Sequence, residues 1–189
     1  VDLFRAKGGK LHDWLLHGSA DHEMTAACSV ELTPRDGSLL QPGEKWVEPI
    51  GESSSLLPYG LIREPSWAKT DDSFSVTFRH ADTAEKPAEK PAAKPVGKGV
   101  RSYLLGGAET EIFLGKSPRI RPAEGDDRKV YDYWMPQLVA RRRGPAPLAS
   151  LFAAVHEPFQ PEPFIESVRA VPLDPPGADC VALEVRHGE

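Results

Sequence analysis

The sequence predicts an all-β protein, an antiparallel β-sandwich, and three observations support this. The chain of 189 residues carries 19 prolines and 16 glycines, which break long helices and favour short strands joined by turns. Short stretches alternate between apolar and polar residues with a period of two, as strands with one buried face do. No window of about 12 residues, the length of a stable helix, shows an apolar stripe of helical period.

The clearest strand pattern is Ser73–Arg79, in which Phe74, Val76 and Phe78 point to one face. Val1–Ala6 and Asp13–His17 flank Gly8-Gly9, and we expect these two strands to pair as a hairpin around Lys7–Lys10. Further short strands, each bounded by Gly, Pro or charged residues, are expected at Val100–Leu105, Glu111–Leu114, Gln137–Arg142, Leu148–Val155, Phe164–Leu173 and Cys180–Arg186.

One segment does not belong to a core. Residues Thr83–Gly99 read TAEKPAEKPAAKPVGKG, with lysine and proline each recurring at every fourth position and Val96 as the single large apolar residue. Prolines withdraw the amide donors that a strand needs, so we expect an extended, solvated Lys/Pro-rich insert. Residues 1–189 then form a single sandwich region with a long loop. The alternative, a boundary between two domains, would leave each half with a thin core.

The bulk composition excludes several classes of protein. A net charge of −5 gives no reason to expect nucleic-acid binding, and no apolar run approaches the ~18 residues of a membrane span. Two cysteines are too few for a disulfide scaffold, so we expect two unrelated thiols, with a Cys28–Cys180 disulfide as the alternative. The first residues, Val1-Asp2-Leu3-Phe4, lack an initiator Met, and we expect a segment of a longer chain.

The histidines His12, His17 and His22 are five residues apart and have acidic neighbours, which raises the question of a metal site. An odd spacing along a strand sends His12 and His17 to opposite faces, so ordinary hydrogen bonding is the favoured role. No nucleophile motif, phosphate-binding loop or dinucleotide fingerprint occurs. We therefore expect neither catalytic residues nor metal ligands.

An aromatic cluster at Tyr131, Tyr133 and Trp134 precedes the basic run Arg141–Arg143. Aromatic faces stack on sugar rings, and arginine forks grip carboxylate or sulfate groups, so this mixture suits an acidic glycan. The alternative interpretation is a core aromatic cluster followed by a charged strand end.

Three blocks of sequence together resemble one known family. VDLFRAKGGKLHDWLLHG is similar to the Asp-x-Phe-Arg-x-x-Gly-Gly-x-x-His-Asp segment in the β-sandwich of heparinase II/III-like polysaccharide lyases. RSYLLGGAETEIFLGKSPRIRP resembles the strand pair that follows in that family, and RRRGPAPLASLFAAVHEPFQPEPFIESVRAVPL resembles its Arg-Arg-x-Gly, Phe-x-x-Val-x-Glu-Pro and Phe-Ile-x-x-Val pattern. The order agrees along most of the chain, apart from the Lys/Pro-rich insert.

This resemblance implies the late β-sandwich segment of a larger, multidomain lyase that is periplasmic or secreted. Such enzymes cleave uronic-acid-containing polysaccharides by β-elimination, in which a base removes the proton beside the carboxylate and an acid protonates the leaving oxygen. The family's N-terminal helical toroid supplies much of that machinery, and its divalent metal lies on an earlier strand. This segment is therefore expected to be non-catalytic, to hold no cofactor, and to have the toroid and an acidic polysaccharide as partners.

The residues expected to contact that substrate are Arg5, His12, His17, Tyr133, Trp134 and Arg141. The polymer stays open among heparan-like, alginate-like and other uronate glycans. The alternative is a carbohydrate-binding or structural sandwich module without a lyase parent.

Overall fold

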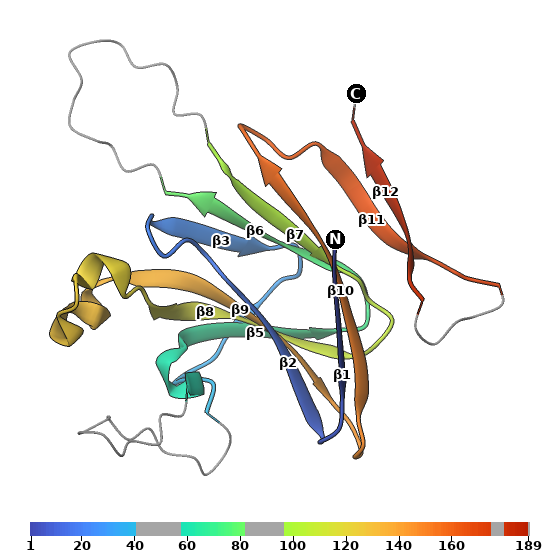
Figure 1. Ribbon diagram of the computed structural model, residues 1–189, viewed down its shortest axis with the longest axis horizontal. Helices are drawn as coiled ribbons and strands as arrows, with labels where there is room; N and C mark the ends of the chain where they lie inside the picture. The colour runs from blue at the N-terminus through green and yellow to red at the C-terminus, as the bar shows by residue number, and fades with distance from the viewer. Residues whose placement is uncertain (41–57, 82–96, 175–179, 189) are drawn as a thin grey trace.

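The computed structural model describes residues 1–40, 58–81, 97–174 and 180–188. These residues form two five-stranded antiparallel sheets packed face to face, with a separate two-stranded sheet outside them (Figure 1). The described ranges contain three short 3-10 turns and no α-helix. They hold no helix that is long and apolar enough to cross a membrane. The predicted all-β sandwich is confirmed.

The first sheet, sheet A, has the strand order β1-β10-β7-β6-β3. Its strands are β1 (Asp2–Lys7), β3 (Met24–Cys28), β6 (Phe74–His80), β7 (Gly99–Leu104) and β10 (Ala149–Phe159). The second sheet, sheet B, has the order β2-β9-β8-β5-β4. Its strands are β2 (Leu11–His17), β4 (Thr33–Pro34), β5 (Arg63–Thr70), β8 (Thr110–Pro118) and β9 (Trp134–Arg143).

The main core lies between the sheets and follows the period of two that the sequence shows. Phe74, Val76 and Phe78 of β6 are all buried, while Ser75 and Thr77 between them are not. Facing residues of sheet B complete the core with Trp14, Ile112, Leu138 and Ala140. Burial of such large apolar side chains is the dominant stabilising term of a sandwich.

The predicted β1–β2 hairpin is wrong. β1 pairs with β10 in sheet A, whereas β2 pairs with β9 in sheet B, so Gly8 and Gly9 carry the chain from one layer to the other. Both glycines have positive φ, 121° and 55°, which a residue with a Cβ adopts only with strain. The corner is held by the β9–β10 connection, because the Gly8 amide donates to the Leu148 carbonyl and the Leu148 amide donates to the Gly9 carbonyl.

Strands β6 and β7 flank residues 82–96 and pair directly as antiparallel neighbours. Each sheet takes strands from both sides of this segment, so the two sides share one core. Most of the predicted Lys/Pro-rich insert lies outside the described residues. At its end, Gly99 is already the first residue of β7 and pairs with Arg79 and Phe159.

The third sheet consists of β11 (Ile165–Val171) and β12 (Ala182–His187), and it covers the outer face of sheet A (Figure 1). Ile165, Val168 and Leu183 pack there against Ala153 and Val155 of β10. The buried Glu157 side chain anchors this layer, because its Oε1 accepts from the amides of Phe164 and Ile165 at 2.5 and 2.8 Å. The sandwich is thus three layers deep on this side.

Strands of both sheets end or begin together at one end of the sandwich. β2, β6, β8 and β10 end there, and β3, β7 and β9 begin there. We call it the His80 end, after the last residue of β6.

Candidate functional site

A groove with a volume of about 510 Å³ opens between the two sheets at the His80 end. Its apolar wall is made by Leu16, Met24, Phe78, Val100, Pro158 and Phe159. The polar residues that line it are His17, Ser19, His80, Lys98 and Gln160. An apolar hollow with a few convergent polar groups is the usual form of a binding site for a small molecule or a polymer segment.

The loop between β2 and β3 shapes one wall of the groove. The Gly18 amide donates to the Pro136 carbonyl at 2.8 Å, which holds the start of this loop on β9. His17 Nδ1 lies 2.6 Å from the Gly18 carbonyl oxygen, and the Ser19 amide contacts Met24 Sδ at 3.0 Å. These short-range bonds fix the side of the groove that the predicted residue His17 lines.

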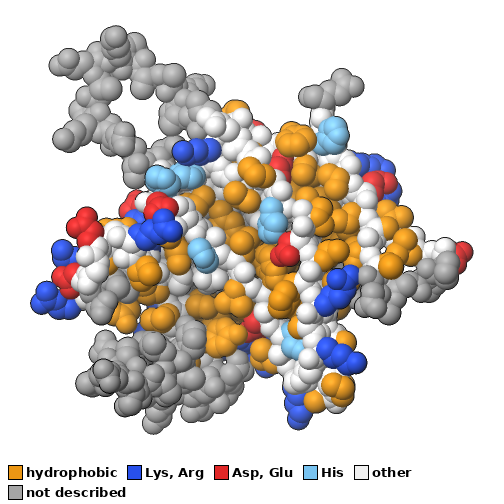
Figure 2. Space-filling model, viewed as in Figure 1, with side chains coloured by type: hydrophobic (Ala, Val, Ile, Leu, Met, Phe, Trp, Pro, Cys, Tyr) orange, Lys and Arg blue, Asp and Glu red, His pale blue; other side chains and the backbone are white. Residues whose placement is uncertain are grey.

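A lobe of residues 120–133 lies beside the groove at the same end. It contains the 3-10 turns η2 (Arg121–Ala123) and η3 (Asp127–Asp132), drawn in yellow at the left of Figure 1. Arg121 ties the lobe to the β2–β3 loop by a bidentate bond to Asp21, at 2.8 and 2.9 Å. Figure 2 shows basic, acidic and histidine side chains side by side over this end of the molecule.

The aromatic residues at the end of the lobe and the start of β9 carry cations on their ring faces. Lys116 Nζ lies 5.1 Å from the Trp134 ring centroid, and the guanidinium carbon of Arg119 lies 5.7 Å from that of Tyr133. Tyr131 packs against Trp134 with the ring centroids 6.2 Å apart, and its carbonyl accepts from the Trp134 indole. Tyr133 and Trp134 are half-buried, so this cluster is neither a closed core nor a free surface.

The structure thus brings His17, Tyr133 and Trp134 to one end, and it places the other three predicted residues elsewhere. Arg141 is buried on the outer face of sheet B, where Nε and Nη2 donate to Asp13 at 2.8 and 2.7 Å. The guanidinium lies between the rings of Tyr59 and Phe113, at 5.2 and 5.4 Å. Protein atoms thus cover the Arg141 guanidinium in this structure, which gives Arg141 a structural role, and its contact with a substrate stays a prediction.

Tyr59 completes this buried cluster by donating its hydroxyl to Asp13. Burial, together with the bond to Asp13, raises the pKa of Tyr59 to about 12, so the hydroxyl stays protonated and remains a donor. The cluster holds η1 (Pro58–Leu61) against sheet B.

His12 and Arg5 also lie away from the His80 end. His12 Nδ1 lies 2.9 Å from Ser150 Oγ, and its Nε2 lies 2.7 Å from the Gly8 carbonyl oxygen. Both ring nitrogens are thus engaged at the glycine corner, which gives His12 an architectural role. Arg5 is exposed on β1, opposite Leu151 of β10 in the register.

Most residues that line the groove, including His80 and Lys98, were not predicted from the sequence. His80 extends the alternating run of Ser73–Arg79 by one residue, and Lys98 is the last lysine of the Lys/Pro repeat. Both signals were visible in the sequence. What was missing is the pairing of β6 with β7, which brings the two residues together.

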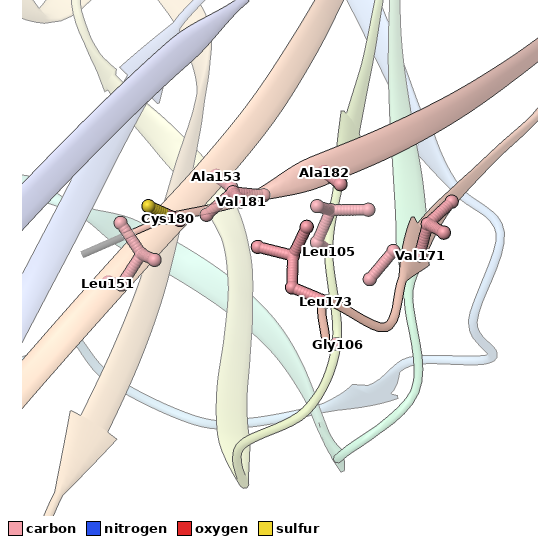
Figure 3. Close-up of a pocket in the computed structure, with 10 residues that line it drawn as sticks. Leu105, Gly106, Leu151, Ala153, Val171, Leu173, Cys180, Val181 and Ala182 are labelled. Carbon is pink, nitrogen blue, oxygen red and sulfur yellow. The ribbon is translucent and has the colours of Figure 1, made fainter. Parts of the chain in front are cut away.

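A second, smaller cavity of about 250 Å³ lies between sheet A and the β11–β12 layer. Its lining is almost entirely apolar, and Leu105, Leu151, Leu173 and Val181 point into it (Figure 3). Cys180 borders it as an exposed free thiol, and Cys28 is also free. With few polar groups to orient a ligand, this cavity is a packing hollow of the third layer.

Within the described ranges, no group of three or more His, Cys, Asp or Glu side chains could hold a metal ion. His12 and His17 lie at opposite ends of β2 and His22 lies in the following loop, so the three early histidines do not converge. A comparison of the chain with protein-family models, with curated proteins and with solved structures finds no match.

Proposed function

We propose that this chain is the β-sandwich portion of a periplasmic or secreted heparinase II/III-like lyase that acts on uronic-acid-containing polysaccharide. In this proposal the segment holds the acidic chain and leaves the β-elimination to the helical toroid of the parent. The observation that carries it is the gathering of aromatic rings and cations at the His80 end, on a lobe that Arg121 ties to the β2–β3 loop beside the groove. Aromatic faces suit the C–H faces of sugars, and lysine or arginine suits their carboxylates.

The placement of the three family-like sequence blocks supports the same proposal. They supply β1 and β2, then most of β7 with β8, then the last three residues of β9 with β10 and β11. These strands are contiguous in space, because sheet A contains the order β1-β10-β7 and sheet B the order β2-β9-β8. The resemblance therefore covers one continuous half of the sandwich rather than scattered segments.

The edge face of the sandwich, where β1 and β2 are the outermost strands of the two sheets, supports a protein partner. Leu3, Phe4 and Leu15 are exposed on these strands, with Leu3 and Phe4 on opposite faces of β1, and Figure 2 shows hydrophobic side chains across the middle of the view. Exposed apolar patches on a folded domain mark sites that other proteins cover. We assign this face to the toroid of the parent.

Binding of oligouronates to the isolated chain tests the proposal. We expect salt-sensitive binding of at least one oligouronate, no binding of a neutral oligosaccharide of equal length, and no unsaturated product from the chain itself. Trp134→Ala should weaken binding several-fold, because the ring and the Lys116 cation above it are both disturbed. Trp67→Ala is the matched control, since Trp67 is an exposed tryptophan on β5.

Equal binding of neutral and acidic oligosaccharides would contradict the proposal, as would no binding of any uronate polymer. The lyase parent has its own test. Cloning the full gene and assaying its product for unsaturated uronate should show elimination activity, and a full-length protein without it would leave only a carbohydrate-binding module.

A further inference from the structure

Three basic side chains meet at the mouth of the groove. His80 ends β6 and Lys98 directly precedes β7, and the His80 amide donates to the Lys98 carbonyl at 3.0 Å. His22, from the β2–β3 loop, packs its ring on His80 with the centroids 5.0 Å apart. His80 and Lys98 line the groove itself. Three different segments of the chain therefore place their nitrogens around one opening.

The acidic groups nearby have other partners. Asp21 is held by Arg121, Glu162 is held by Arg79, and Glu23 lies 4.0 Å from Arg119. Among the residues that the structure describes, no ion pair joins His22, His80 or Lys98 to a carboxylate. His17 lines the same groove and places a third imidazole beside the opening. The opening thus collects potential positive charge that the described residues leave unneutralised.

We propose that His22, His80 and Lys98 form a carboxylate-binding site at the mouth of the groove, and that this site takes up a proton when its ligand binds. Two imidazoles this close cannot both carry a proton without repulsion, and Lys98 adds to it. A carboxylate bound among them offsets this repulsion, because its negative charge stabilises the protonated form of each ring. The apolar wall of Phe78 and Val100 would receive the uncharged body of the ligand.

The direction of the pH dependence follows from the same groups. Burial, Lys98 and His22 all lower the pKa of His80, so the ring is neutral at neutral pH in the empty groove. A bound carboxylate raises that pKa, and linkage then requires affinity to increase as the pH falls toward it. The uptake of one proton changes the dissociation constant by up to about tenfold per pH unit. That the carboxylate belongs to a uronate sugar rests on the proposed function.

The test uses two probes with the whole chain. One is an oligouronate, and the other is benzoate, a carboxylate with an apolar body and no sugar. Calorimetric titration at several pH values, in two buffers of different ionisation enthalpy, counts the protons taken up by the wild type without any substitution. We expect proton uptake with both probes, and tighter binding at pH 5.5 than at pH 7.5.

Variants then test whether the proton is taken up at this site. His80→Asn should reduce both the proton uptake and the pH dependence, and Lys98→Gln should weaken binding at every pH. His187→Asn, on exposed β12 in the third sheet, is the matched control and should leave both unchanged. NMR titration of the His80 ring in the wild type gives a second measurement, in which the ligand should raise its pKa.

The carboxylate site and glycan binding can fail independently in these experiments. Oligouronate binding without proton uptake, and indifferent to His80→Asn, would overturn the carboxylate site and leave glycan binding standing. Proton-linked binding of benzoate alone would support the site and remove the glycan function. Failure of both probes to bind would overturn both.

Discussion

At the scale of single residues, Arg141 and Asp13 form an ion pair in which both side chains are buried. The Arg141 and Asp13 side chains are 2% and 4% exposed, and the two bonds between them are close to ideal length. A buried pair of this kind need not stabilise the fold more than apolar residues would. Removal of one partner, however, leaves the other charge buried without compensation.

We therefore expect Arg141→Ala to lower the free energy of unfolding by about 3–5 kcal/mol. Arg169→Ala is the control: Arg169 makes an equally bidentate bond to Glu184 but is 60% exposed, so solvent screens the pair and the loss should be much smaller. Urea denaturation of both variants measures the difference. If Arg141→Ala abolished glycan binding and left stability unchanged, the structural role given to Arg141 would be refuted.

His156 makes stability depend on pH. Its Nδ1 lies 2.9 Å from the buried Ser102 hydroxyl, and its ring stacks on Trp14 with the centroids 6.1 Å apart. Burial lowers the pKa of His156 below its ordinary value of 6.5, and the charge of Asp2 offsets only part of this effect. The folded state thus prefers the neutral ring. Its contribution to stability is complete above pH 6.5 and is lost as the pH falls below it.

The expected result is a fall in unfolding free energy between pH 7.5 and pH 5.5 that is smaller in His156→Asn than in the wild type. His80, whose pKa is also lowered, contributes in the same direction and remains in the variant. Denaturant titrations at the two pH values provide the comparison. Parallel losses in the two proteins would show that His156 is not responsible.

At the scale of elements, the third layer depends on one carboxylate of β10. Glu157 is buried, and one of its oxygens accepts two backbone amides at the start of β11. Without it, these two buried amides would lack their partner, which costs about 1–3 kcal/mol. The β11–β12 layer would then rest on its apolar contacts alone.

Glu157→Ala should therefore increase hydrogen exchange first at the amides of Phe164 and Ile165 and through β11. Glu166→Ala, an exposed substitution on β11 itself, serves as the control. Exchange in β6 and β7 should remain slow in both variants, since these strands are centrally paired in sheet A. Equal protection of β11 in Glu157→Ala and the wild type would show that the carboxylate does not anchor the layer.

The same scale shows what sequence reasoning could and could not predict. Strand β6 was predictable because its alternation is set by local burial, and all three of its predicted core residues are buried. β1 and β2 were found as strands, but their pairing was not. A Gly-Gly corner between layers and a Gly-Gly hairpin look alike in sequence, and the deciding bonds come from Leu148, far along the chain.

Strand β5 was missed because REPSWAKT has no clean alternation, and its residue Glu64 has a positive φ beside a shift in register. Arg141 and Arg142 read as a charged strand end, yet both are buried, because β9 is a central strand between β2 and β8. Their partners, Asp13 and the Leu151 carbonyl, are supplied by other strands. The composition of a candidate site is hard to predict for the same reason, since it depends on which strand ends meet.

At the scale of the whole molecule, the sandwich is closed by strands from both sides of residues 82–96. Arg79 pairs with Gly99 across that gap, so the chain returns to a neighbouring strand after the segment. The Lys/Pro-rich composition supplies almost no apolar surface to bury. The stability of the sandwich should then depend on this segment only through the entropy of closing a loop.

Replacement of residues 82–96 by a four-residue Gly/Asn turn, with Gly97 and Lys98 kept, tests this idea. Closing a shorter loop costs less entropy, so we expect the free energy of unfolding to rise by about 1 kcal/mol. The carboxylate site should keep its affinity, because His80 and Lys98 stay joined by the same backbone hydrogen bond. Urea denaturation and benzoate titration of the shortened chain measure the two effects. A loss of more than about 2 kcal/mol would exceed anything that loop closure explains and would mean that the segment contributes contacts of its own.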